Sequence, residues 1–156
     1  MAAGFARSRP DTLDGDGLVV GIVRARWNGE LVNRLVDGAR RAIHFAGATA
    51  VETTAPGSFE LPFAAQTLAL TGTVDALVVV GAVIRGETTH YELVSEGCAD
   101  GIMRVQLDTG IPIGFGVLTV ENEIQGLARS EAEGGHNVGE EATLAAIEMA
   151  IQRRDA

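Results

Sequence analysis

The chain has 156 residues, of which 46% are hydrophobic and 21% are charged, a composition typical of one globular domain with a buried core. Its formal net charge of −9 disfavours a surface that binds nucleic acid or an anionic membrane, because both of these partners are negative themselves. We therefore expect neither nucleic acid nor a membrane among its partners.

The first residues and the single cysteine indicate where the protein works. Residues 1–17 contain Gly15 and Gly17 and show no periodicity, which is typical of a mobile N-terminal arm. No hydrophobic stretch follows the first arginines, so we expect no secretory signal, and no apolar run reaches the ~20 residues of a membrane span. Cys98 is the only cysteine, which argues against an intramolecular disulfide or a CxxC-type metal site. We expect one domain over residues 18–156, a cytoplasmic location and no bound metal.

The rest of the chain alternates between predicted strands and predicted helices. Runs rich in β-branched residues predict strands, and apolar residues at helical spacing predict helices. In chain order we expect a strand over 18–24, a helix over 29–46, a strand over 48–55, a helix over 59–70, a strand over 75–84, a helix over 88–108, a strand over 111–120, and helices over 122–130 and 138–154. This alternation predicts a flavodoxin-like, three-layer α/β/α fold with a four-stranded parallel sheet.

Segment 81–91, GAVIRGETTHY, is the strongest candidate for a functional site. It begins with the last four residues of the almost unbroken apolar run over 75–84, as expected of a central parallel strand that helices cover on both faces. Backbone N–H groups at Gly86, Glu87 and Thr88 should then point outward at the start of the next helix, where unpaired donors and the helix dipole favour an anion. His90 follows in the first turn, so anion binding and proton transfer would share one loop.

Several blocks of the sequence occur in the order and spacing of a known enzyme family. They are PGSFELP at 56–62, RGETTHY at 85–91 and PIGFGVLT at 112–119, followed by Arg129. On these blocks the chain resembles the 6,7-dimethyl-8-ribityllumazine synthases of riboflavin biosynthesis, from about residue 18 to residue 152. The resemblance implies that 5-amino-6-(D-ribitylamino)uracil and 3,4-dihydroxy-2-butanone 4-phosphate condense to the lumazine, with release of phosphate and water. It implies small-molecule substrates and no metal or organic cofactor.

The resemblance also implies roles for individual residues, which stand at the carboxyl ends of the predicted strands, where open parallel sheets bind ligands. The proton-transfer residue would be His90. The residues implied to bind the uracil ring and the ribityl chain are Trp27, Ser58, Phe59, Glu60, Ala82, Val83, Ile84 and Phe115. Those implied to bind phosphate are Gly86, Glu87, Thr88 and Arg129, with Glu87 acting through its backbone N–H because its carboxylate would repel the anion. Phe115 and Arg129 would come from a neighbouring subunit, which implies a homopentamer or a multiple of one.

One stretch departs from the family pattern and leaves alternatives open. Segment 130–139, SEAEGGHNVG, replaces a stretch that commonly carries a lysine, and the printed sequence contains no lysine. His136 is a candidate for the missing group, and the size of the assembly stays open. Two other functions also remain: an archaeal-type riboflavin synthase, which has no need of a phosphate site, and a flavin- or lumazine-binding homologue without activity.

Overall fold

The computed structural model describes residues 9–156, and its elements follow the predicted order. Their bounds are β1 Val19–Ala25, α1 Gly29–Ala46, β2 Thr49–Ala55, the short 3₁₀ helix η1 Ser58–Glu60, α2 Leu61–Ala69, β3 Ala76–Ile84, α3 His90–Thr109, β4 Ile113–Val120, α4 Glu123–Ala128 and α5 Val138–Asp155. The main difference lies at the start of α3, which begins at His90 rather than Thr88. The Thr88 hydroxyl accepts a hydrogen bond from the His90 N–H over 3.3 Å, so Thr88 and Thr89 form a turn before the helix.

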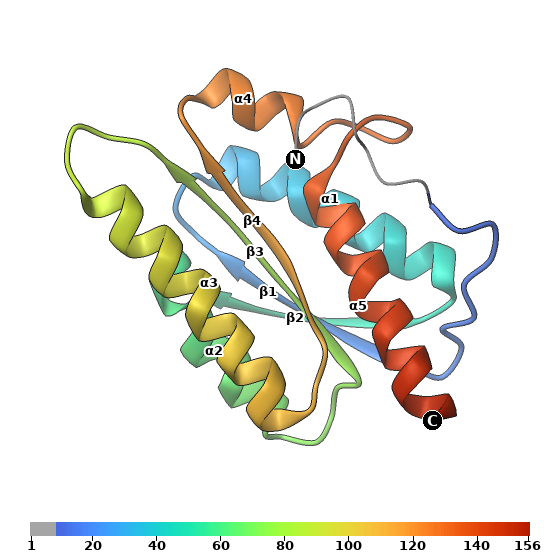
Figure 1. Ribbon diagram of the computed structural model, residues 1–156. Coiled ribbons are helices and arrows are strands. Elements are labelled where there is room, and N and C mark those ends of the chain that lie inside the picture. Colours follow the sequence, from blue (N-terminus) through green and yellow to red (C-terminus); the bar gives the residue numbers. More distant parts are fainter. Residues whose placement is uncertain (1–8) are drawn as a thin grey trace.

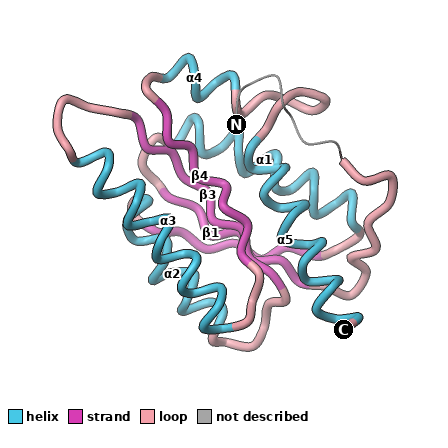
Figure 2. Tube along the Cα trace, viewed as in Figure 1, coloured by secondary structure: helices cyan, strands magenta, loops and turns pink. Residues whose placement is uncertain are grey.

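The elements form three layers with the sheet in the middle (Figures 1 and 2). Within the described residues the four strands are parallel and lie in the order β2–β1–β3–β4. Helices α1 and α5 cover one face of the sheet, and α2 and α3 cover the other (Figure 1). The predicted three-layer α/β/α fold with a four-stranded parallel sheet is therefore confirmed.

Strand β3 contributes to the hydrophobic core on both faces of the sheet, because its side chains alternate between the two faces. Val78 and Val80 pack in the cluster with α1 and α5, whereas Leu77 and Val79 pack in the cluster with α2 and α3. All four side chains are fully buried. This explains why the run from 76 to 84 is apolar throughout instead of alternating with polar residues.

The predicted N-terminal arm covers residues 1–17, and its residues 1–8 lie outside the described residues. The part from residue 9 runs beside α1. The Gly15 N–H donates to the Ala46 carbonyl over 2.8 Å, and the Arg9 guanidinium lies 4.1 Å from the centre of the Phe45 ring. The division into an arm and one domain over 18–156 stays a prediction.

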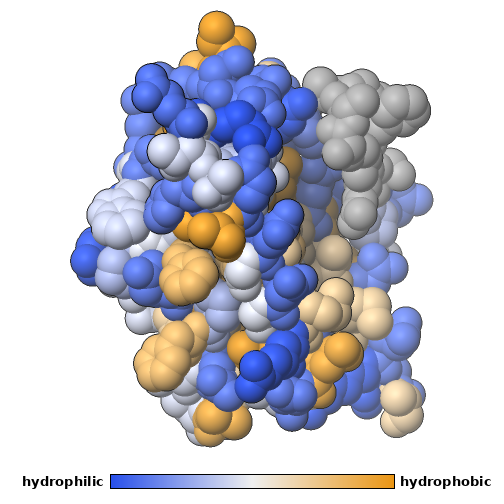
Figure 3. Space-filling view, turned by 60° about the vertical axis from the view of Figure 1, so that its left-hand side comes forward, coloured by the Kyte–Doolittle hydropathy of each residue, from blue (hydrophilic) through white to orange (hydrophobic). Residues whose placement is uncertain are grey.

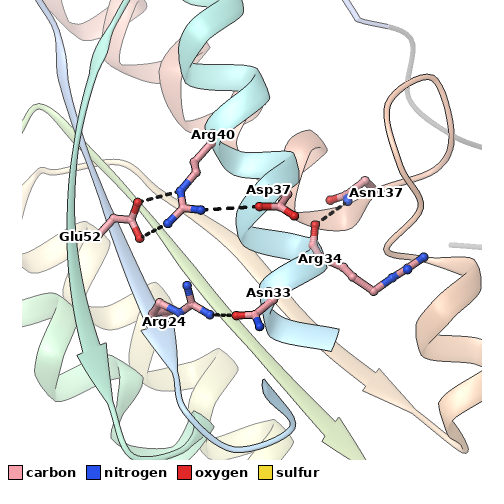
Figure 4. Close-up of polar contacts among 7 residues, drawn as sticks. All are labelled: Arg24, Asn33, Arg34, Asp37, Arg40, Glu52 and Asn137. Carbon is pink, nitrogen blue, oxygen red and sulfur yellow. Dashed lines mark hydrogen bonds and ion pairs between the residues drawn. The ribbon is translucent and has the colours of Figure 1, made fainter. Parts of the chain in front are cut away.

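Polar contacts join α1 to the edge strand and to the segment before α5 (Figure 4). Asn137 accepts a hydrogen bond from the Glu140 N–H and so caps α5, while its amide nitrogen donates to the Arg34 carbonyl of α1 over 3.1 Å. On the other side of α1, Arg40 donates two hydrogen bonds of 2.8 Å to the Glu52 carboxylate of β2. These contacts hold β2 and the segment after α4 to one helix.

The Arg40–Glu52 pair predicts a pH-dependent stability. The hydrogen bond from Arg40 lowers the pKa of Glu52 below its ordinary value of 4.5, so the pair stabilises the fold above that value and loses its effect as pH falls through the lower pKa of the folded chain. Because both side chains are partly exposed, Glu52→Gln should reduce the free energy of unfolding by about 0.2–1 kcal/mol near neutral pH. Urea unfolding measured near neutral pH and again well below pH 4.5 checks this, and the difference from wild type should shrink in acid.

Asp37→Asn is a matched control, because Asp37 contacts the same Arg40 only through one longer ion pair of 3.5 Å. It should have the smaller effect near neutral pH. A Glu52→Gln difference that stays constant or grows in acid would contradict the prediction.

Candidate active site

A cleft of about 410 Å³ opens at the carboxyl ends of β1 and β3. The chain leaves β1 toward β2 on one side and later returns to β3 on the other, and ligands bind at such a switch point in parallel sheets. The residues that line the cleft are Trp27, Asn28, Ser58, Phe59, Glu60, Ala82, Val83, Ile84, His90 and Val94. The cleft therefore brings together every residue predicted to bind the uracil and ribityl groups, except Phe115, and places His90 beside them.

Two aromatic rings in the cleft keep most of their surface exposed. Trp27 is 64% exposed and Phe59 is 61% exposed. Each ring packs against a glycine: a Cβ atom on Gly57 would overlap the indole, and one on Gly97 would lie 3.0 Å from the Phe59 ring. The missing side chains let each ring lie against the backbone, and the exposed surface is available to a flat heterocycle.

The backbone of β3 has a free edge in the cleft. Strand β1 pairs with β3 only as far as Val80, whereas β4 pairs with β3 up to Ile84. Because backbone polar groups alternate along a strand, those of Ala82 and Ile84 face the side that β1 has left, and those of Val83 face β4. The side chain of Val83 instead joins the hydrophobic cluster with α2 and α3. Of the three β3 residues predicted to bind the uracil compound, Ala82 and Ile84 are thus the ones whose backbone groups face the open side.

Asn28 is a cleft residue whose role the sequence did not predict. Its backbone adopts the left-handed conformation, with φ of 59°, and its side-chain nitrogen donates to the Ala82 carbonyl over 2.7 Å. This hydrogen bond joins the turn after β1 to the end of β3. An asparagine tolerates positive φ better than most residues. The sequence could therefore have indicated a turn at Asn28, but not its hydrogen bond to Ala82.

Two polar side chains enter the cleft from the η1 turn. Ser58 is only 6% exposed, and a Cβ atom on Gly81 would lie 2.5 Å from its hydroxyl oxygen. One carboxylate oxygen of Glu60 is buried and has no hydrogen-bond partner among the residues that the structure describes. Since a buried acceptor without a partner costs free energy, Glu60 offers a site for a donor such as a substrate hydroxyl.

The predicted phosphate loop lies next to the cleft, between Ile84 and His90. Gly86, Glu87 and Thr88 are all exposed, and nothing lies within 4 Å of a Cβ atom placed on Gly86. The loop leads directly into α3, a helix of 20 residues whose dipole favours an anion at this end.

Phe115 and Arg129 lie on a different surface. They line a groove of about 520 Å³ along β4 and α5. The Arg129 side chain donates to the Gln125 carbonyl over 3.0 Å. His136 lines the same groove, with its Nδ1 atom 3.2 Å from a Glu141 carboxylate oxygen. The predicted site residues thus fall on two separate faces of one chain.

The part of the chain that the structure describes offers neither a metal-binding cluster nor a reactive thiol. Residues 9–156 contain no group of three or more histidine, cysteine or acidic residues arranged to hold a metal ion. Cys98 is fully buried in α3, and this burial raises the pKa of its thiol to about 12, so it packs as a small hydrophobic residue.

None of the described helices combines the length and the apolar character that crossing a membrane requires.

Comparison with known proteins shows the family of the chain. The sequence model of the 6,7-dimethyl-8-ribityllumazine synthase family matches residues 17–154. The chain belongs to this family. A synthase of that name from Kineococcus radiotolerans is 48% identical over 144 residues, which cover 91% of this chain and 89% of the relative. One from Leifsonia xyli subsp. xyli is 44% identical over 155 residues, covering 99% and 98%. One from Thermococcus kodakarensis is 44% identical over 137 residues, covering 87% and 86%.

Asn28 predicts a difference between two substitutions. Asn28→Gly should lose the hydrogen bond to Ala82 but keep the left-handed turn, at a cost of about 1 kcal/mol. Asn28→Ala should lose both and cost about 1–2 kcal/mol more. Urea unfolding of the two variants measures the difference, and equal costs would show that the backbone conformation contributes nothing.

Proposed function

We propose that this chain condenses 5-amino-6-(D-ribitylamino)uracil with 3,4-dihydroxy-2-butanone 4-phosphate to 6,7-dimethyl-8-ribityllumazine, with release of phosphate and water. The observation that carries the proposal is the cleft, which gathers residues of four segments suited to a flat ring, a chain of hydroxyls and a proton transfer. Family membership supports the same reaction, since the relatives carry the name of this synthase.

The uracil compound fits the cleft through complementary surfaces. Trp27 would stack on the pyrimidine, while the Ala82 N–H and the backbone groups of Ile84, on the free edge of β3, would hydrogen-bond the polar edge of the ring. Ser58 and the unpaired oxygen of Glu60 would receive hydroxyls of the ribityl chain. The ring and the chain would then be fixed at separate ends of the cleft.

The second substrate would place its phosphate on the N–H groups of Gly86, Glu87 and Thr88. Its ketone would thereby come within reach of the amine of the bound uracil compound. The amine attacks the ketone and loses water to form an imine, phosphate leaves by elimination, and the second amine closes the ring with loss of a second water. His90, which lines the cleft, would carry protons between these steps. Holding the two substrates together contributes up to about 7–11 kcal/mol to such a reaction.

A second copy of the chain would complete the site. Exposed hydrophobic side chains interrupt the hydrophilic surface on the side of α2 and α3 (Figure 3). They include Phe59, Phe63, Leu70, Leu93, Met103 and Leu107. The groove along the edge strand β4 and α5 carries Phe115 and Met149, which are 37% and 48% exposed. Two different apolar surfaces on one chain suit a head-to-tail contact, which closes into a ring. We propose a homopentamer, or a multiple of one, in which Phe115 and Arg129 of one subunit cover the cleft of the next.

The test is to incubate the purified protein with both substrates and to follow lumazine fluorescence. Formation of the lumazine above the uncatalysed background supports the synthase. Binding of the lumazine without turnover would favour a non-catalytic homologue, and conversion of the lumazine itself to riboflavin would favour a riboflavin synthase. Either of these two results would overturn the proposal.

Arg129 should serve the phosphate alone. Arg129→Ala should raise the KM for the butanone phosphate on the order of tenfold to a hundredfold, the size of a charged hydrogen bond of ~1.5–3 kcal/mol, and leave the KM for the uracil compound nearly unchanged. Steady-state kinetics with each substrate varied in turn measures the split. Arg129→Lys should give an intermediate value because it keeps the charge but not the planar fork. Equal increases for both substrates would contradict the assignment.

A shared site predicts that two impaired chains restore activity together. If His90 and Arg129 of one site belong to different subunits, His90→Asn and Arg129→Ala chains refolded together in equal amounts should form intact sites at roughly a quarter of the interfaces in a ring. The mixture should then be more active than the average of the two variants refolded separately. Mixed assemblies, verified by native mass spectrometry, that show no such gain would place both residues in one subunit.

A further inference from the structure

Arg85 is the cation nearest in sequence to the proposed phosphate loop, yet its guanidinium is engaged elsewhere. Its Nε atom donates to a Glu121 carboxylate oxygen over 3.0 Å, and another of its nitrogens donates to Glu92. The guanidinium carbon also lies 4.1 Å from the centre of the Tyr91 ring, a cation–π geometry. Three side chains therefore occupy Arg85 at once.

These partners hold both ends of the loop. Arg85 follows β3, Glu121 follows β4, and Tyr91 and Glu92 stand in the first turn of α3. The Arg85 N–H also donates to the Val120 carbonyl of β4 over 2.9 Å, which extends the pairing of β3 and β4 by one bond. The guanidinium thus joins the start of α3 to the ends of two strands, and residues 86–89 form the loop between these points (Figure 1).

Packing does little to hold the loop itself. Residues 86–90 are all exposed, and the space around Gly86 is open. The loop extends beyond the carboxyl end of β3, where Figure 1 shows it leading from β3 into α3. The fixed points at its ends must therefore set the direction of its N–H groups.

The charges also separate Arg85 from a phosphate. Two carboxylates face one guanidinium, so the cluster of Arg85, Glu92 and Glu121 carries a formal charge of −1. The hydrogen bond to Glu92 comes first among the causes that raise the pKa of Arg85, and the same bond lowers the pKa of Glu92. Glu92 and Glu121 take two of the five N–H donors of the guanidinium, and the negative charge of the cluster opposes the approach of an anion to the other three.

We propose that Arg85 is a positioning residue, which fixes the phosphate loop and the His90 end of α3 against β4 through Glu92, Glu121 and Tyr91, and does not bind the phosphate. The proposal rests on the function proposed above for the loop. In this proposal the positive charge at the phosphate comes from Arg129, and Arg85 orients the uncharged N–H donors of the loop. Misplacing such donors by about 1 Å is enough to slow a reaction by ~10²-fold.

Removal of Glu121 distinguishes the two roles of Arg85 by the sign of its effect. If Arg85 bound phosphate, Glu121→Ala would free the guanidinium and remove a negative charge, and the KM for the butanone phosphate would fall. If Arg85 positions the loop, Glu121→Ala and Arg85→Gln should both raise that KM, on the order of tenfold, and leave the KM for the uracil compound nearly unchanged. The double variant should be little worse than Arg85→Gln alone, because both changes break one network.

The control is Arg40→Gln, which breaks another two-bond arginine–glutamate contact, far from the cleft on the α1 face of the sheet. It should leave both KM values unchanged. Thermal unfolding of all variants separates a local effect from a loss of folding. Arg85→Lys should recover little, since an ammonium group cannot hold two carboxylates and the Tyr91 ring in the same planar arrangement.

Hydrogen exchange gives a readout that does not depend on turnover. The Leu93 N–H donates to the Thr89 carbonyl over 3.2 Å, so exchange of the peptide covering residues 89–95 reports whether the first turn of α3 is formed. Arg85→Gln and Glu121→Ala should both speed this exchange, and Arg40→Gln should not. Unchanged exchange in both variants, or a lower KM in Glu121→Ala, would overturn the proposal. If the wild type forms no lumazine but exchange responds as expected, the proposed function fails while the positioning role stands.

Discussion

The unequal overlap of the strands is the feature on which the rest of the site depends. Because β1 ends its pairing at Val80 and β4 continues to Ile84, the last residues of β3 are held on one side and open on the other. A strand held on one side is rigid, yet it presents backbone donors and acceptors to a ligand. The turn after β1 crosses this opening, and the Asn28 side chain anchors that turn to the Ala82 carbonyl. Because Trp27 stands in the same turn, its position at the cleft follows from the unequal pairing of β3 with β1 and β4.

The fold was readable from the sequence because its signals are local. The β-branched runs and the apolar residues at helical spacing predicted the alternation of strands and helices. The apolar run in β3 predicted a central strand, since burial on two faces leaves no room for polar residues. The start of α3 was harder to predict. Thr88 and Thr89 look like helix caps, but Thr88 uses its hydroxyl to bond the His90 N–H and keeps the turn outside the helix.

The site was only partly readable, because several of its contacts join residues far apart in sequence. Trp27, Glu60 and His90 follow strand ends, where the sequence predicts a ligand, and they do line one cleft. The side to which the backbone polar groups of Val83 point depends on the register with β4, which cannot be read from the sequence. The hydrogen bond from Asn28 to Ala82 spans 54 positions and the pair of Arg85 with Glu121 spans 36. The sequence around each residue therefore does not predict these contacts.

Electrostatics gives the division of the site between two surfaces a physical reason. A phosphate ester is an anion, and this chain has a formal net charge of −9. The ionisable side chains among the described residues that line the cleft are Glu60 and His90, and the nearby Arg85 is neutralised by two acids. A single chain therefore offers the phosphate N–H dipoles but little net positive charge. Arg129 lies in the other groove, so under the proposed function it would reach the phosphate only through a neighbouring copy, and assembly and phosphate affinity would become one property of the protein.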